Sequence, residues 1–279
     1  PSPVPASLWL PFSAIVNGTD KAWTSAQPLG LLGAAIALMA SFLTLESRVT
    51  SPLMPLGLFR LRNVATANVV GVLWSAAMFA WFFLSALYLQ LVLGYSPLKV
   101  GLAFLPANLI MGAFSVGLSA KLVMRFGIRP PLAVGLLLAA VGLALFARAP
   151  VHGGFVVDVL PSMILLGFGA GMAFNPLLLG AMSDVEPSES GLASGVVNTA
   201  FMMGGALGLA VLASIAASRT DSLTVSGDGK LAALVGGYHL AFLVGAIFAA
   251  AAAAVGTAFF RAAHAPSGEH AQQLEEAAA

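Results

Sequence analysis

The chain has 279 residues, of which 59% are hydrophobic and only 8% are charged. Soluble domains carry about 25% charged residues, so this composition excludes an ordinary soluble protein and predicts an all-α integral membrane protein. The formal net charge of +1 gives no reason to expect a nucleic-acid partner. Because the chain has no cysteine and its four histidines are scattered, we expect no disulfide, no metal and no cofactor.

Hydropathy divides the chain into apolar stretches, which need about 20 residues each to cross a bilayer. The short stretch Leu8–Val16 is interpreted as the end of a helix whose start is missing. A first complete span is predicted at Pro28–Leu45, and a connector that contains three arginines follows it up to Asn63. Six further spans are predicted, at Val64–Leu93, Val100–Met124, Pro131–Phe146, Leu160–Met182, Gly191–Ala217 and Leu234–Phe260.

These spans, about seven in all, predict three parts of the chain. Residues 1–63 hold the truncated helix, one extra span and a cytoplasmic connector, and residues 64–260 form a six-helix transmembrane bundle. A polar segment, Ser218–Lys230, is predicted to join the last two spans. Residues 261–279 are polar and of low complexity, which predicts a disordered tail.

A short basic loop sets the predicted orientation of the spans. The stretch Gly117–Gly135 places Lys121, Arg125 and Arg129 between two long apolar runs. Short cationic loops remain in the cytoplasm, so alternation of the spans predicts a cytoplasmic C-terminus. Seven of the twelve Lys and Arg residues then lie inside, and the arginines clustered at span ends decide the orientation.

The eleven acidic residues all fall in predicted loops, span ends or the tail. Ionisable groups at membrane depth are costly and mark proton pathways or catalytic sites. An intramembrane protease would require a buried Asp pair, Ser with His, or a His-Glu-x-x-His zinc site, and the predicted spans contain none of these. We therefore do not expect an enzyme.

Helical spacing places methionines, aromatic rings and amides on shared faces of the predicted spans. Such a face suits a cavity for bulky apolar or cationic molecules, because Met side chains repack and aromatic faces attract cations. Alternatively, the aromatic and Met side chains face lipid and each Asn bonds across a helix interface. The candidate cavity residues are Trp74, Met78, Trp81, Tyr88, Asn108, Met111, Asn175, Asn198 and Met202.

Small residues and prolines predict how the helices pack. Glycines four residues apart let neighbouring backbones approach closely. Two prolines, Pro106 and Pro176, are predicted to kink their helices and could serve as gates. His239, near the start of the last span, is interpreted as an interfacial anchor, with a proton relay as the alternative. The predicted packing glycines are Gly167, Gly171, Gly191, Gly195, Gly204 and Gly208.

The basic loop also carries a resemblance to a known family. A glycine followed by a cluster of the type R-x-G-R, here Gly117 leading to Arg125-Phe126-Gly127-Ile128-Arg129, resembles the loop signature of the major facilitator superfamily. Three further segments narrow the resemblance, namely PLMPLGLFRLRN (52–63), LYLQLVLGYSPLKVGLAFLP (87–106) and GLASGVVNTAFMMGGALGLAV (191–211). Together they resemble the C-terminal half of the fourteen-span drug:proton antiporters, over about residues 28–260.

This resemblance implies export of drugs or other small amphipathic or cationic molecules, driven by protons and by rocking of two six-helix halves. It implies that Gly117, Arg125, Gly127 and Arg129 help to latch the halves together on the cytoplasmic face. The partner would be an N-terminal half that holds most of the proton-carrying acids, in a bacterial inner membrane. One half cannot alternate access, so we expect this chain alone not to transport.

One segment departs from the family pattern. Where relatives often have Arg-Gln after Asn-Thr-Ala, this chain has Phe201-Met202-Met203, so any polar contact made there is absent. Two other functions stay open: a helical membrane partner or scaffold that transports nothing, and a transporter of the same fold for a lipid or metabolite.

Overall fold

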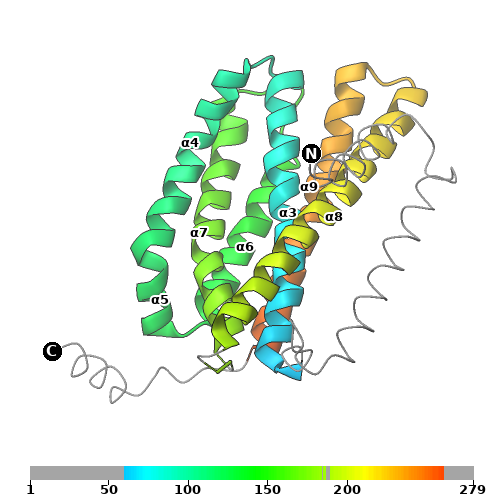
Figure 1. Ribbon diagram of the computed structural model, residues 1–279. Coiled ribbons are helices and arrows are strands. Elements are labelled where there is room, and N and C mark those ends of the chain that lie inside the picture. The colour runs from blue at the N-terminus through cyan, green and yellow to red at the C-terminus, as the bar shows by residue number, and fades with distance from the viewer. Residues whose placement is uncertain (1–59, 184, 187–188, 261–279) are drawn as a thin grey trace, which may run out of the picture. The chain divides into compact units, whose positions relative to one another are not determined.

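The computed structural model describes residues 60–183, 185–186 and 189–260, and these residues form long helices joined by short turns (Figure 1). The extra span predicted at Pro28–Leu45, nearly all of the connector and the C-terminal tail lie outside the described residues. Three short π-helical segments, labelled η, continue or begin the α-helices. The elements are α3 (Arg62–Leu87), η3 (Tyr88–Val92), α4 (Pro97–Ala113), η4 (Phe114–Leu118), α5 (Ser119–Phe126), α6 (Arg129–Phe146), η5 (Phe155–Val159), α7 (Leu160–Met182), α8 (Ser190–Val225) and α9 (Lys230–Phe259).

Each of the six spans predicted between Val64 and Phe260 coincides with a helical stretch, and the all-α class is confirmed. Five stretches of the described chain are long and apolar enough to cross a membrane. The sixth begins as α4, whose 17 residues fall short of the roughly 20 that a bilayer requires. It reaches sufficient length because η4 and α5 continue it to Phe126.

One predicted boundary is wrong, because α8 does not end at Ala217. It continues to Val225 and has 36 residues, so at 1.5 Å per residue it is about 54 Å long. Polar side chains of this extension bond to the backbone of the same helix: the hydroxyl of Thr220 donates to the carbonyl of Ala216 at 2.9 Å. The chain turns only at Gly227, whose φ of 97° favours glycine.

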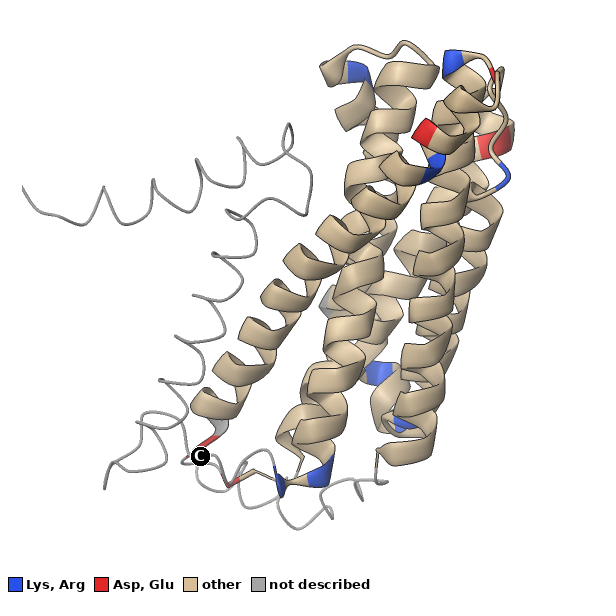
Figure 2. Ribbon diagram, turned by 90° about the vertical axis from the view of Figure 1, so that its right-hand side faces the viewer, with Lys and Arg blue, Asp and Glu red and all other residues tan. Residues whose placement is uncertain are grey.

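Helix α3 contacts α7, α8 and α9. Helix α7 also contacts α4 and α6, while α9 also contacts α6 and α8. Both views show α8 running obliquely to the other helices (Figures 1 and 2). Large aromatic side chains from three helices fill the core between them, including Trp74 and Trp81 of α3, Phe146 of α6 and Phe242 of α9.

The charged residues of the described helices lie toward the two ends of the bundle, and the middle of the ribbon carries none (Figure 2). The carboxylates fit this pattern, since Asp158 lies in the first turn of η5 and Asp221 lies near the end of α8. A charge at the centre of a bilayer is expensive, so this distribution is what a membrane-spanning bundle requires.

Glycines allow direct backbone contact between α6 and α7. A Cβ added to Gly135 would lie 2.8 Å from the carbonyl oxygen of Gly169, and one added to Gly169 would lie 2.6 Å from that of Gly135. The two backbones therefore touch without intervening side chains. The predicted glycine pairs did not include this contact. A Cβ added to the predicted Gly167 of α7 would lie 2.6 Å from the carbonyl oxygen of Ala107 in α4, so these two helices are similarly close.

The predicted pairs on α8 lie in two different environments. A Cβ added to Gly204 would lie 2.7 Å from Cα of Val72, and a Cβ added to Gly208 would lie even closer to Ala76. Both glycines therefore pack against α3. Around Gly191 and Gly195 no described atom lies within 4 Å of an added Cβ. The same four-residue spacing therefore marks one contact inside the described bundle and one face that the bundle leaves exposed.

Gly169→Ala is expected to lower the free energy of unfolding by about 1–3 kcal/mol, because the new methyl group overlaps backbone atoms of α6. Thermal unfolding of the purified chain in detergent measures this change as a lower midpoint. Gly195→Ala is the matched control, and it should leave the midpoint unchanged or raise it, since Ala favours helix by about 1 kcal/mol over Gly. Equal midpoints for the two variants would contradict the backbone contact.

Candidate functional site

Three of the candidate cavity residues lie in the core of the bundle. Trp74 and Trp81 of α3 and Tyr88 of η3 are at most 1% exposed, so this row of residues lies on the inner side of the bundle. The Trp81 ring lies edge-on to Phe104 of α4, with ring centres 6.1 Å apart. The Tyr88 ring lies edge-on to Phe146 of α6 at 5.7 Å. These rings hold helices of the same bundle together.

The hydroxyl of Tyr88 also holds the turn that follows α6. It donates to the carbonyl of Pro150 at 2.6 Å, and Nε2 of His239 on α9 lies 2.8 Å from the carbonyl of Ala149. A carbonyl only accepts, so His239 presents an N–H at Nε2. At the start of η5, Oδ2 of Asp158 accepts from the backbone N–H of Gly154 at 2.7 Å. Tyr88 of η3 and His239 of α9 thus fix one turn, a geometry that suits an anchoring role for His239.

The other six candidates are partly or fully exposed. Asn175 is half-buried, and its amide donates to the backbone carbonyl of Ser115 at 2.8 Å, which is a bond across the interface of α7 and η4. Met78 and Met111 are also half-buried. Three candidates are exposed: Asn108 on α4, and Asn198 and Met202 on α8. The nine residues therefore do not share one surface within the described bundle.

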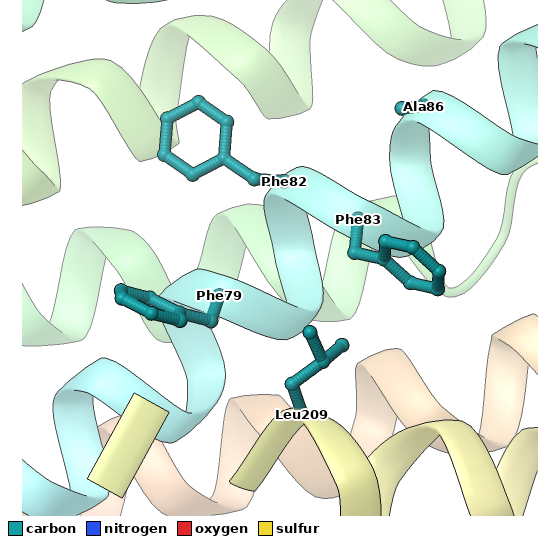
Figure 3. Close-up of a pocket in the computed structure, with 5 residues that line it drawn as sticks. All are labelled: Phe79, Phe82, Phe83, Ala86 and Leu209. Carbon is teal, nitrogen blue, oxygen red and sulfur yellow. The ribbon is translucent and has the colours of Figure 1, made fainter. Parts of the chain in front are cut away.

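An apolar hollow lies between α3 and α8 (Figure 3). It has a volume of about 440 Å³, and every side chain that lines it is apolar. Phe83 is the most exposed of the aromatic residues that line the hollow, with 47% of the residue exposed. The lining residues are Phe79, Phe82, Phe83, Ala86 and Leu209.

The sequence predicted none of the residues that line the hollow. Phe79, Phe82, Phe83 and Ala86 follow the same helical spacing as the Trp74–Trp81–Tyr88 row, but on another face of α3. Periodicity identifies a face without showing whether it turns inward. Leu209 lies far from these residues in the sequence, and it reaches the hollow only because α8 packs on α3.

The basic end of the bundle contains two arginines that bind the last carbonyls of α9. A guanidinium nitrogen of Arg129 donates to the carbonyl of Phe260, and Nε of Arg62 donates to that of Phe259 at 3.0 Å. The C-terminal carbonyls of a helix have no intrahelical donors and carry partial negative charge, so cations stabilise them. Arg62 and Arg129 therefore attach α9 to the N-terminal ends of α3 and α6.

The other signature residues have different surroundings. Arg125 is exposed, and its guanidinium lies over the ring of the adjacent Phe126 at 5.4 Å. Gly127 ends α5 with a φ of 79°, which explains the glycine in the turn. Gly117 lies in η4, where no described atom lies within 4 Å of an added Cβ. Of the two signature arginines, Arg125 alone presents its side chain to the exterior.

This geometry defines an integral membrane protein: a bundle of apolar helices with charged ends, backbone contacts through glycine and an apolar hollow between two helices. Residues 6–209 match the Major Facilitator Superfamily. The chain therefore belongs to the Major Facilitator Superfamily of membrane transporters.

Relatives with stated functions support this membership. The puromycin resistance protein of Streptomyces alboniger is 32% identical, over 82% of this chain and 46% of the relative. The tetracenomycin C resistance and export protein of Streptomyces glaucescens is 35% identical, over 75% of this chain and 38% of the relative. The cephamycin export protein of Amycolatopsis lactamdurans is 34% identical, over 87% and 49%. The chain thus spans less than half the length of each of these curated relatives.

Arg129→Gln is expected to loosen the last turn of α9, because hydrogen bonds from charged donors contribute about 1.5–3 kcal/mol. Backbone amides of that turn should exchange with deuterium at least about tenfold faster, since 1.4 kcal/mol is a factor of ten. Hydrogen–deuterium exchange read by mass spectrometry measures this effect. Arg125→Gln, four residues away and exposed, should leave exchange in α9 unchanged; acceleration by both variants would contradict the assignment.

Proposed function

We propose that this chain is the C-terminal half of a proton-coupled drug exporter, in which two six-helix halves rock about a site near the midplane. The observation that carries this proposal is the match between a six-helix bundle and less than half of relatives named for drug resistance or export. A unit that holds only half of the helices has no second half to rock against. The chain by itself would then be inactive.

The hollow between α3 and α8 is the proposed contribution of this half to substrate binding. Phe79, Phe82 and Phe83 offer ring faces and edges, which stack on aromatic groups and attract cations. This surface suits small amphipathic or cationic drugs whose charge is matched elsewhere. Asn108 and Asn198 are exposed on α4 and α8, and they remain proposed contacts for the polar parts of such molecules. Met202, also exposed on α8, remains a proposed contact for their apolar or cationic parts.

The proton carrier is proposed to lie in the N-terminal half. In the described part of this half the Asp and Glu residues lie toward the bundle ends (Figure 2). We also propose a bacterial inner membrane as the location, with the basic end and the C-terminus on the cytoplasmic side. Transport of this kind involves no chemical conversion of the drug, which is why we propose no enzymatic activity.

The N-terminal half is the proposed partner of the exposed face of α8. Gly191 and Gly195 leave room for a second backbone, and Asn198 lies one turn further along the same face. At the basic end, Arg125 is the signature arginine that could reach the partner half, because Arg129 is bound to α9.

Expression in a drug-sensitive bacterium tests the proposed function. Residues 1–279 alone are expected to give no efflux of a cationic dye, whereas co-expression with the N-terminal half encoded upstream should give efflux that a protonophore abolishes. Efflux by the chain alone would contradict the proposal of a half-transporter.

Phe83→Ala in the paired protein should weaken efflux, and Leu240→Ala, an exposed residue of α9 outside the hollow, serves as the control.

A further inference from the structure

Two helices of the bundle each contain a break in their regular hydrogen bonding. In η4 the backbone N–H of Ser119 bonds to the carbonyl of Phe114, five residues back, instead of the carbonyl of Ser115 four residues back. In α7, Pro176 has no N–H, so the carbonyl of Met172 lacks its usual donor. Each break leaves one carbonyl without the partner that a regular α-helix would supply.

Each of these two carbonyls is bound by a side chain from the other helix. The amide of Asn175 on α7 donates to the carbonyl of Ser115 at 2.8 Å. The hydroxyl of Ser119, at the start of α5, donates to the carbonyl of Met172 at 3.4 Å, a longer bond from a fully buried side chain. The two bonds cross the same interface in opposite directions. Asn175 directly precedes Pro176, so both bonds lie at the breaks themselves.

Glycine brings the two breaks within reach of each other. A Cβ added to Gly171 would lie 2.7 Å from Cβ of Phe114 and 3.0 Å from the carbonyl oxygen of Met111. The Phe114 ring also packs edge-on against Phe168 of α7, with ring centres 5.1 Å apart. The short side chains of Ser119 and Asn175 can bridge the helices because the backbones already lie this close.

We propose that Ser119 and Asn175 are positioning residues that join η4 and the Pro176 turn into one joint, so that the two helices bend together. An unpaired carbonyl in an apolar surrounding is unfavourable, so a change of hydrogen-bond register in one helix requires the other helix to change with it. Single π-helical turns inside α-helices are frequent at functional sites. The joint does not depend on the nature of the transported molecule.

Distances across each break test this proposal, and the absence of cysteine from the chain makes spin labelling direct. Cysteines at Leu102 and Met124 bracket η4, and cysteines at Val157 and Leu179 bracket Pro176; all four positions are exposed. Each pair is separated by 22 residues, or about 33 Å along a helix. Pulsed electron paramagnetic resonance on the 279-residue chain in lipid nanodiscs then reports the bend of each helix separately.

The joint predicts an effect in the helix that does not carry the substitution. Asn175→Ala is expected to shift or broaden the Leu102–Met124 distance, although residue 175 lies in α7. Ser119→Ala is expected to do the same to the Val157–Leu179 distance, although residue 119 lies in α5. The double variant should change each distance no more than the larger single effect, because either substitution already uncouples the joint.

Two matched controls separate the joint from general loosening. Ser75→Ala removes a buried hydroxyl that donates within its own helix, to the carbonyl of Val72 at 3.1 Å, and Asn198→Ala removes an exposed amide of α8. Both should leave the two distances unchanged. If one test variant fails to fold, the other still tests the proposal, because each variant removes one of the two bonds of the same joint. Unchanged distances in a folded test variant, or equal changes in the controls, would overturn the proposal.

Discussion

A backbone carbonyl or N–H group inside hydrocarbon must find its partner within the protein, because leaving it unpaired costs several kcal/mol. The regular parts of α3, α6 and α9 meet this requirement by their own helical bonds. At helix breaks, helix ends and turns, side chains from other helices donate to the free carbonyls. Asn175 donates to a carbonyl of η4, Tyr88 to the carbonyl of Pro150 in the turn after α6, and Arg129 to the carbonyl that follows α9. The polar contacts between helices in this bundle are therefore found mainly where helical hydrogen bonding is interrupted.

The same surroundings explain why small residues determine the packing. Lipid tails are as apolar as the helix surfaces, so helices associate through close fit instead of through exclusion of water. Gly135 against Gly169 and Gly204 against Val72 provide that fit inside the described bundle. Close backbone packing of this kind favours movement of the helices as a group, which the proposed rocking of two halves requires. The exposed glycines of α8 and the apolar hollow are the surfaces that we propose for the partner half and the substrate.

Segment length made the helices predictable from the sequence, since a bilayer demands about 20 apolar residues and charges mark the ends. The inner face of α3 was not predictable, because Trp74 and Phe83 both belong to rows of helical spacing and only packing shows which row is buried. The contact of Gly135 with Gly169 joins two helices and leaves no local pattern. The π-helical turn at η4 has no sequence signature. The polar residues after Ala217 predicted a loop, because a sequence does not show that such side chains bond to the backbone of their own helix.

The central claim is that this half supplies packing and an apolar surface, while the proton is carried elsewhere. The most direct measurement is drug efflux from membrane vesicles under an imposed pH gradient, using the paired transporter with each described carboxylate changed singly to its amide. These carboxylates are Asp158, Glu186, Glu189, Asp221 and Asp228. The expected result is efflux close to that of the parent for every variant. Loss of gradient-driven efflux in one variant, with expression and drug binding retained, would place a proton carrier in this half and contradict the claim.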